Sequence, residues 1–432
     1  LRALRRKSCI SLGHWVMKFS SHTNRPNGWT QMTLEEVCQT FTSGGTPSRR
    51  KPEFFENGTI PWVKTKELKD GVITTTEECI TADALGNSSA KLLPKDTVLL
   101  AMYGATVGQL GILGREAACN QACAAMVPRK DIADSHFLFY LLLHHRPQII
   151  DQVTGGAQQN LSGSQIRRFS FDFPPIEQQR RIARALWAID QKVAVNKAIS
   201  HTLEDICKNI FNSWFIDFDP VKAKMAGETP FGIDSETAVL FPDSLELSSV
   251  GEIPSGWKVQ SFGELVSKQN VGKVFSSRTA LKRGRVPILD QKGSGRVGFH
   301  NESPGCIASP DQPLVVFGNH TCVIRLIPYN FSVIQNVFPL LSTQADVFWL
   351  YFALQGKQDY EGYKGHWPDF IVHETAVPPK NLTTKFGELV GPLFKLSWSL
   401  QNQATTLGKI RDALLPRLIS GEIEIPDELL AE

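Results

Sequence analysis

The chain has 432 residues, 42% of them hydrophobic and 21% charged, with a formal net charge of +3. This length predicts two or three packed domains, and this composition excludes a long disordered tract. The net charge is too small to argue for nucleic acid by itself, and it does not exclude it, since basic faces can be balanced by acidic ones.

The eight cysteines form no Cys-x-x-Cys pair and have no histidine at metal-ligand spacing. We therefore expect reduced thiols, a cytoplasmic protein, and no metal or other cofactor. Because no stretch approaches the roughly 20 apolar residues of a spanning helix, we also expect no membrane segment.

Residues 1–26 are expected to be an N-terminal extension. Their first part is basic but lacks the apolar core and small-residue cleavage site of a signal peptide. Because Met17 closely precedes the first module, residues 1–16 are interpreted as an upstream segment outside the fold. A truncation starting at Met17 that failed to fold or bind would contradict this interpretation.

Residues 27–175, the first module, mix short β-rich runs with glycine and proline, which predicts a compact α+β domain. The β-rich runs are 97–102, 108–113 and 122–127, and one helix is expected around 135–144.

Residues 176–218 are expected to form one long central helix. No proline or glycine occurs between residues 177 and 214, and apolar residues recur in steps built from three and four. At about 1.5 Å per residue, this helix would be on the order of 55 Å long, more than one small domain can cover. Its predicted seam is Ile182, Leu186, Ile189, Val193, Leu203, Ile210 and Trp214, with Asn196 as a polar core position that sets register.

The second half of the chain repeats markers of the first. The Pro-x-Gly-Trp of residues 26–29 returns at 254–257, and the Pro-Pro of residues 174–175 returns at 378–379. After a connector over 219–253, we expect a second module over 254–379, a C-terminal long helix over 380–421 and a tail over 422–432. Gly391 and Pro392 should kink this helix or mark its true start. Its seam at the same spacing is Phe386, Val390, Leu393, Ser397, Leu400, Leu407, Leu414 and Leu418.

Several short motifs accompany this repeat. They are Ser-Gly-Gly-Thr-Pro at residues 43–47, Pro-Pro-Ile-Glu-Gln-Gln at 174–179, Phe-x-x-Trp-Phe-x-Asp-Phe at 211–218 and Arg-Asp-x-Leu-Leu-Pro-x-Leu-Ile-Ser-Gly at 411–421. In this order the motifs resemble those of the specificity (S) subunits of type I restriction-modification systems. The resemblance covers the chain from about residue 27 to residue 418.

The resemblance implies an α+β fold with two pseudo-repeated target-recognition domains, separated by two long antiparallel coiled-coil helices. Each domain would read one half of a bipartite site in double-stranded DNA, and the helices would dock two methyltransferase subunits, with restriction or translocase subunits as further partners. Half-sites read from the major groove lie about 34 Å apart per helical turn, so a rigid helix pair would act as a ruler for the unread gap.

Loops rich in glycine, amide and basic residues are the expected DNA-binding sites, since amides can pair with adenine, Arg or Lys with guanine, and loop backbone with phosphate. The alternative is that these residues only form and cap turns. In the second module, the alternatives are a hydrogen-bonding histidine and a buried tryptophan. The candidates are Gly44, Gly45, Thr46, Arg49, Lys64, Lys66, Tyr103, Gln158, Gln159 and Asn160 in the first module, and Lys292, Arg296, Asn319, His320, Thr321, Lys364, His366 and Trp367 in the second.

The chain lacks the motifs of the enzymes that would act on such a site. Both Pro-Pro pairs follow an apolar residue rather than the Asn or Asp of a methyltransferase, and no Gly-x-x-x-x-Gly-Lys-Ser/Thr phosphate loop occurs. We therefore expect a non-catalytic subunit that leaves the chemistry to a DNA adenine methyltransferase and restriction endonuclease complex. A free-standing DNA-binding regulator and an assembly scaffold without DNA contact remain alternatives. Ile199 and Ile206 lie off the helix seam, which favours a docked partner.

Overall fold

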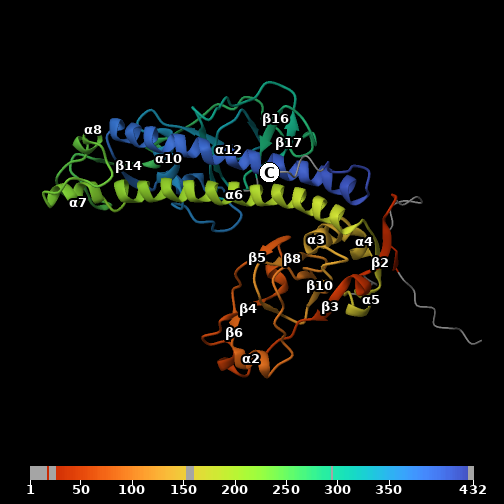
Figure 1. Cartoon of the computed structure of the whole chain (residues 1–432). Coiled ribbons are helices and arrows are strands. Elements are labelled where there is room, and N and C mark those ends of the chain that lie inside the picture. Colours follow the sequence, from red (N-terminus) through yellow and green to blue (C-terminus); the bar gives the residue numbers. More distant parts are fainter. Residues whose placement is uncertain (1–16, 19–25, 152–159, 293–294, 427–432) are drawn as a thin grey trace, which may run out of the picture. The chain divides into compact units, whose positions relative to one another are not determined.

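The computed structural model describes residues 17–18, 26–151, 160–292 and 295–426, which form a mixed α/β fold with two long helices (Figure 1). The described residues divide into two compact units, one within residues 1–194 and 405–432 and the other within residues 195–404. The predicted upstream segment, residues 1–16, lies outside the described residues.

The first unit is built on a five-stranded sheet of order β3-β10-β7-β8-β5, in which β5 pairs with β8 in parallel and the other pairs are antiparallel. The unit also contains two three-stranded sheets, of order β1-β11-β2 and β6-β4-β9. The strands are β1 (Met17–Lys18), β2 (Thr30–Thr33), β3 (Cys38–Ser43), β4 (Ile60–Val63), β5 (Gly71–Ile73), β6 (Cys79–Ile80), β7 (Val98–Ala101), β8 (Leu110–Leu113), β9 (Ala118–Cys119), β10 (Cys123–Pro128) and β11 (Phe169–Phe173).

Helix α3 (Ser135–His144) covers the five-stranded sheet and has the bounds that the apolar run at 135–144 predicts. Asp134 caps it by accepting hydrogen bonds from the backbone N–H groups of His136 and Phe137. Its residues 137–142 are all buried, so the helix is apolar on every side and belongs to the core. The other short helices are α1 (Leu34–Val37), α2 (Ala82–Gly86), α4 (Arg146–Asp151) and α5 (Gly163–Arg167), with 3₁₀ turns at Pro52–Phe54 and Thr65–Glu67.

The second unit contains a four-stranded antiparallel sheet of order β15-β21-β18-β19 and a three-stranded sheet of order β17-β16-β20. Two-stranded pairs β14-β22 and β12-β13 complete it. The strands are β12 (Leu245–Ser248), β13 (Gly251–Pro254), β14 (Lys258–Ser261), β15 (Ser267–Lys268), β16 (Val286–Leu289), β17 (Arg296–His300), β18 (Leu314–Gly318), β19 (Ile324–Ile327), β20 (Ser332–Val333), β21 (Val337–Leu341) and β22 (Glu374–Val377); the helices are α7 (Asp219–Met225), α8 (Ser235–Val239), α9 (Phe262–Leu265), α10 (Val347–Leu354) and α11 (Trp367–Phe370).

The two long helices are α6 (Ile176–Phe215) and α12 (Lys380–Ile419), each of 40 residues. One of the two expectations for Gly391 and Pro392, that they mark the start of the second helix, is wrong, because α12 begins at Lys380. Packing overrides the weak helix propensity here. Gly391 is buried with the ring of Phe348 against it, at the place where a larger side chain would stand.

In the second unit, α6 and α12 pair in antiparallel fashion. The hydroxyl groups of Ser200 and Ser397 are 2.8 Å apart, and further along, the Cys207 thiol donates to the carbonyl of Val390 at 3.9 Å. All four residues are buried or nearly so. The predicted seam missed Ser200 and Cys207, because a polar or small residue carries no apolar periodicity signal.

The predicted seam residues differ in burial. Ile182, Leu186, Trp214, Phe386, Val390, Ser397 and Leu418 are buried, as is Asn196, whereas Ile189, Val193, Leu203, Ile210, Leu393, Leu400, Leu407 and Leu414 are half-buried. The amide nitrogen of Asn196 donates to Gln403 at 3.3 Å, and its amide oxygen has no partner among the described residues. A register-setting role for Asn196 stays a prediction.

Candidate nucleic-acid interface

The glycines of the first predicted loop are packing residues. Gly44 and Gly45 are buried, and a side chain at either position would overlap backbone atoms of Cys119 or Ser89. The indole of Trp62 donates to the carbonyl of Gly45 at 3.0 Å, which fixes the loop further. These contacts favour the turn-forming interpretation for the two glycines, because only a residue without Cβ allows this backbone approach.

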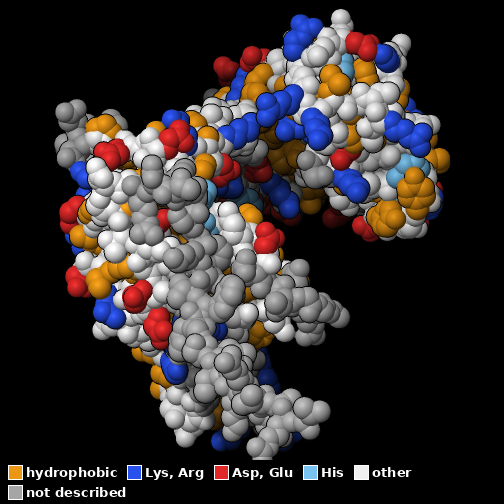
Figure 2. Space-filling view, turned by 90° about the vertical axis from the view of Figure 1, so that its right-hand side faces the viewer, with side chains coloured by type: hydrophobic (Ala, Val, Ile, Leu, Met, Phe, Trp, Pro, Cys, Tyr) orange, Lys and Arg blue, Asp and Glu red, His pale blue; other side chains and the backbone are white. Residues whose placement is uncertain are grey.

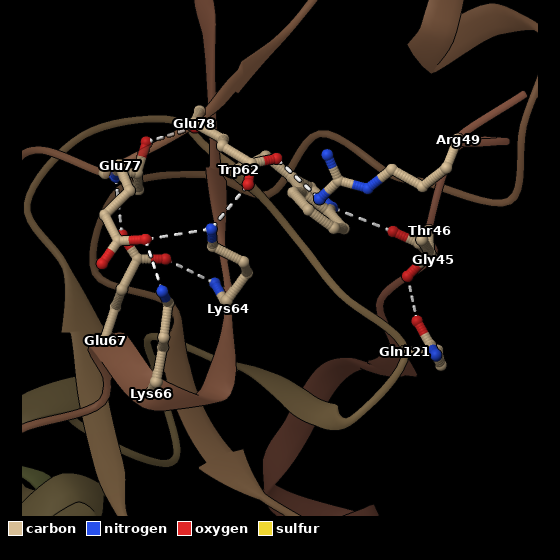
Figure 3. Close-up of polar contacts among 11 residues, drawn as sticks. Gly45, Thr46, Arg49, Trp62, Lys64, Lys66, Glu67, Glu77, Glu78 and Gln121 are labelled. Carbon is tan, nitrogen blue, oxygen red and sulfur yellow. Dashed lines mark hydrogen bonds and ion pairs between the residues drawn. The ribbon is translucent and has the colours of Figure 1, made fainter. Parts of the chain in front are cut away.

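The basic residues of the first module are paired with acidic ones (Figure 3). Lys64 lies 2.7 Å from Glu78 and 3.1 Å from Glu77, Lys66 lies 2.6 Å from Glu77, and Arg49 lies 2.6 Å from Glu78. The hydrogen bond to Glu78 raises the pKa of Lys64, and the hydrogen bond to Lys64 in turn lowers the pKa of Glu78. All three predicted cations are therefore already compensated within the module.

A third carboxylate completes this cluster. Glu67 accepts hydrogen bonds from the backbone N–H groups of Lys64 at 2.7 Å and Glu77 at 2.8 Å. Glu67, Glu77 and Glu78 thus balance three cations, and the guanidinium of Arg49 also lies over the ring of Phe55, at 4.2 Å from its centroid. The sequence reasoning missed these carboxylates, because Glu77 and Glu78 are separated from Lys64 along the chain.

The structure brings together four polar residues of the first module at another place. Thr46 is exposed, and its hydroxyl donates to the side-chain oxygen of Gln121. The hydroxyl of Tyr103 donates to the backbone carbonyl of Gln121 at 2.9 Å, and Tyr103 forms an isolated β-bridge with Asn160. Thr46, Tyr103 and Asn160 were predicted and Gln121 was not. Gln158 and Gln159 lie outside the described residues.

In the second module, Asn319 organises the predicted loops. Its backbone carbonyl accepts from the N–H of His366, and its amide oxygen accepts from the N–H of Trp367, both at 2.8 Å. Asn319 and His366 are buried, and Trp367 is half-buried beside Phe317. These contacts favour structural roles for Asn319, His366 and Trp367.

His320 is held firmly near the surface. Its Nε2 accepts from the amide of Asn336 at 2.9 Å, so its Nδ1–H donates to the carbonyl of Lys364 at 2.7 Å. The backbone N–H of His320 donates to Gln291, at 2.8 Å, and the hydroxyl of Thr321 donates to the carbonyl of Gln291. Lys364 itself pairs with two carboxylates, those of Glu361 and Asp369.

Unpaired basic side chains gather on the second module. Figure 2 shows Lys and Arg side chains spread over this part of the surface, in the upper right of the view. In the segment 278–296, six cations are exposed and form no ion pair with a described carboxylate: Arg278, Lys282, Arg283, Arg285, Lys292 and Arg296. Lys292 and Arg296 are among the predicted residues, and the other four are additional candidates.

The described residues hold no group of three or more His, Cys, Asp and Glu placed to bind a metal ion. In the same parts of the chain, none of the helices has the length and apolar character needed to cross a membrane. The arrangement offers polar loops on both modules and exposed cations without a carboxylate partner on the second, which suit a negatively charged polymer with readable edges.

Comparison with known proteins agrees with this assignment. Residues 26–205 match the family described as type I restriction modification DNA specificity domain. Relatives include the MjaIX specificity subunit of Methanocaldococcus jannaschii, 25% identical over 93% of this chain and 95% of the relative. The HindI specificity subunit of Haemophilus influenzae is 24% identical over 68% and 79%. The EcoR124I/EcoR124II specificity subunit of Escherichia coli is 28% identical over 37% and 40%.

A solved structure shares the fold along nearly the whole chain. The S subunit of a type I restriction-modification system from M. genitalium superimposes with a TM-score of 0.59 and 15% identity, covering 93% of this chain and 98% of that one. Along nearly its whole length, the chain is similar to type I restriction-modification specificity subunits.

Proposed function

We propose that this chain is the DNA sequence-recognition subunit of a type I restriction-modification complex. In this role each module reads one half of a bipartite site, and the chemistry is left to the partner subunits. The observation that carries the proposal is the DNA specificity domain over residues 26–205, together with exposed cations and polar loops on the second module.

The local structure of the two modules supports their origin as two versions of one recognition domain. Each opens with a strand and a one-turn helix, and a capping box joins them: Thr33 with Glu36 in the first module and Ser261 with Glu264 in the second. In each, the opening strand pairs antiparallel with the closing strand, β2 with β11 and β14 with β22.

A second local feature also recurs. Asp134 caps α3 and Asp346 caps α10, and the backbone N–H of each aspartate donates at 3.0 Å to a residue in the first turn of a long helix. The acceptor is Gln179 of α6 in the first case and Thr383 of α12 in the second. Two modules with different loops on one plan would read two different half-sites.

The proposed domain division is the one predicted from the sequence. The recognition modules span 27–175 and 254–379, the connector spans 219–253, and the long helices span 176–218 and 380–421. A helix of 40 residues would be about 60 Å long at 1.5 Å per residue. In our proposal such helices keep the number of unread base pairs constant. Deleting one helical turn from both α6 and α12 should shorten the gap in the methylated motif, and an unchanged gap would refute this ruler.

An apolar surface on the helix pair of the second unit is the proposed docking site for a methyltransferase subunit. Ile199, Ile206, Leu389 and Leu396 are between 41% and 49% exposed. Each directly precedes one of the four contacting residues between α6 and α12, which are Ser200, Cys207, Val390 and Ser397. Because both helices are right-handed and run antiparallel, residues that precede the seam lie on the same side of the pair.

The opposite side of this helix pair is covered by the second module itself. The ring of Phe211 on α6 stacks on the ring of Phe352 on α10, with ring centroids 5.6 Å apart. The ring of Phe394 on α12 lies with its centroid 5.8 Å from that of Phe348 on α10. The four apolar residues therefore lie on the side of the pair away from these contacts and keep more than two fifths of their surface exposed. They fit a partner helix, as in a helical bundle. The proposed complex contains two methyltransferase subunits and a restriction subunit.

Base-resolution methylation mapping tests the function. The host would express the methyltransferase encoded beside this chain, with and without the chain. We expect adenine methylation at a split motif with a fixed gap only when the chain is present. Soluble, associated proteins that leave the methylation pattern unchanged would contradict DNA recognition and favour an assembly scaffold. Binding of the chain alone to one duplex sequence, without a partner, would favour a free-standing regulator.

A further inference from the structure

The loop between α10 and α11 presents an aromatic ring to solvent. Tyr363 is 86% exposed, an unusual state for a side chain of this size. It stands at the apex of a three-residue turn, in which the N–H of Lys364 donates to the carbonyl of Gly362 at 2.9 Å. Gly362 has a φ of +97°, which glycine adopts without strain.

The exposed ring is held in place from behind. It stacks on the imidazole of His320, with ring centroids 4.9 Å apart and planes inclined by 15°. That imidazole is itself fixed by hydrogen bonds on both ring nitrogens, to Lys364 and from Asn336. The buried His366 holds the base of the turn through the carbonyl of Gly362, at 3.2 Å. Tyr363 is therefore a supported aromatic platform with one face open.

The surroundings of this platform suit a nucleic acid. Gln291, which accepts from the N–H of His320, is followed directly by the exposed and unpaired Lys292. Arg296 follows close behind in the same segment, also exposed. Lys292 is thus one residue from the contact that holds the stacked His320. A cation in the same loop region as a flat aromatic face matches the alternation of phosphates and bases along a strand.

We propose that Tyr363 is a base-stacking residue of the second module, which inserts its ring against an unstacked base at the half-site that this module reads. The inference rests on the proposed function and extends it to one side chain and one kind of contact. A duplex yields such a base at a step that opens easily, so the contact adds sequence preference through deformability. Its energy comes from the ring face, and the hydroxyl contributes little.

The test uses the complex of this chain with its methyltransferase and a labelled duplex carrying the motif found by methylation mapping. Tyr363→Ala should weaken binding about 5- to 150-fold, the range for removing one base–aromatic stack. Tyr363→Phe should bind as the native chain does. Tyr360→Ala is the matched control, because Tyr360 lies in the same loop and is 59% exposed; it should also bind as the native chain does.

Permanganate, which oxidises unstacked thymines, provides the second readout on duplexes with thymine placed at successive positions in and around the second half-site. We expect one hyper-reactive thymine with the native chain and Tyr363→Phe, and none with Tyr363→Ala. Native-like binding by Tyr363→Ala, equal losses for Phe and Ala, or an absent hyper-reactive base would each overturn the proposal. Loss of subunit assembly in Tyr363→Ala would also overturn it and assign the ring to a protein partner. If the native complex shows no preference for the motif, the proposed function fails instead.

Discussion

The salt dependence of DNA binding should distinguish the two sets of predicted cations. Lys292 and Arg296 are exposed and have no carboxylate partner among the described residues. By contrast, Lys64 forms ion pairs with Glu77 and Glu78, and Lys66 forms one with Glu77. Each phosphate contact contributes about 0.9 to the slope of log K against log salt concentration. Replacing Lys292 and Arg296 with Gln should therefore lower the slope by up to about 1.8.

This change of slope is large enough to measure. Between 50 and 200 mM salt, a slope difference of about 1.8 corresponds to roughly a 12-fold difference in how much affinity is lost. The double variant with Gln at Lys64 and Lys66 is the matched control, because it removes the same net charge. We expect it to change the slope much less, since ammonium groups held by carboxylates release few counterions from DNA.

Fluorescence anisotropy of the complex with a duplex carrying its motif, titrated at several salt concentrations, provides the slopes. An equal loss of slope in the two double variants would refute the reasoning, because it would mean that the ion pairs of the first module open on DNA. A larger loss for the first-module variant would reverse the assignment. Thermal unfolding of each variant checks that the fold is unchanged.

Three further outcomes follow from the structure. Ile199→Lys should lower the affinity for the methyltransferase subunit in pull-down titrations, while His201→Lys, on another face of α6, should not. Burial lowers the pKa of His145 to about 3 in the folded unit. The contribution of the neutral imidazole to the stability of that unit is therefore complete above about pH 6.5 and is lost as pH falls towards 3. In His145→Phe, the free energy of unfolding of the first unit, measured by hydrogen exchange, should lose about 1.4 kcal/mol less per pH unit over this window. Asp190→Ala should destabilise that unit by about 2 kcal/mol in the same assay, because Arg411 loses a partner at 2.7 Å; wild-type exchange rates in either variant would contradict these assignments.

The long helices and the helix at 135–144 were predictable from the sequence because their signals are local. An uninterrupted run without proline or glycine, with apolar residues three and four apart, specifies a helix through its own hydrogen bonds and one buried stripe. The observed α3 and α6 therefore begin within a residue of the expected positions. The second long helix begins at Lys380, the first residue of its expected range. The alternative start at Gly391 and Pro392 is wrong, because the packing of Gly391 against Phe348 outweighs its low helix propensity.

The availability of the candidate DNA-binding side chains depends on residues distant in sequence. Lys64 is a free cation in the sequence and a paired one in the fold, because two strands bring Glu78 within 2.7 Å of it. Tyr363 shows the reverse case, since an unremarkable residue of a glycine-rich loop becomes a supported ring only when His320 stacks behind it. Helices arise from contacts between near neighbours in the chain. Ion pairs and stacked rings form only where folding brings separate segments together. The pattern of residue types therefore predicted the helices and the resemblance to specificity subunits, but not which side chains remain available to DNA.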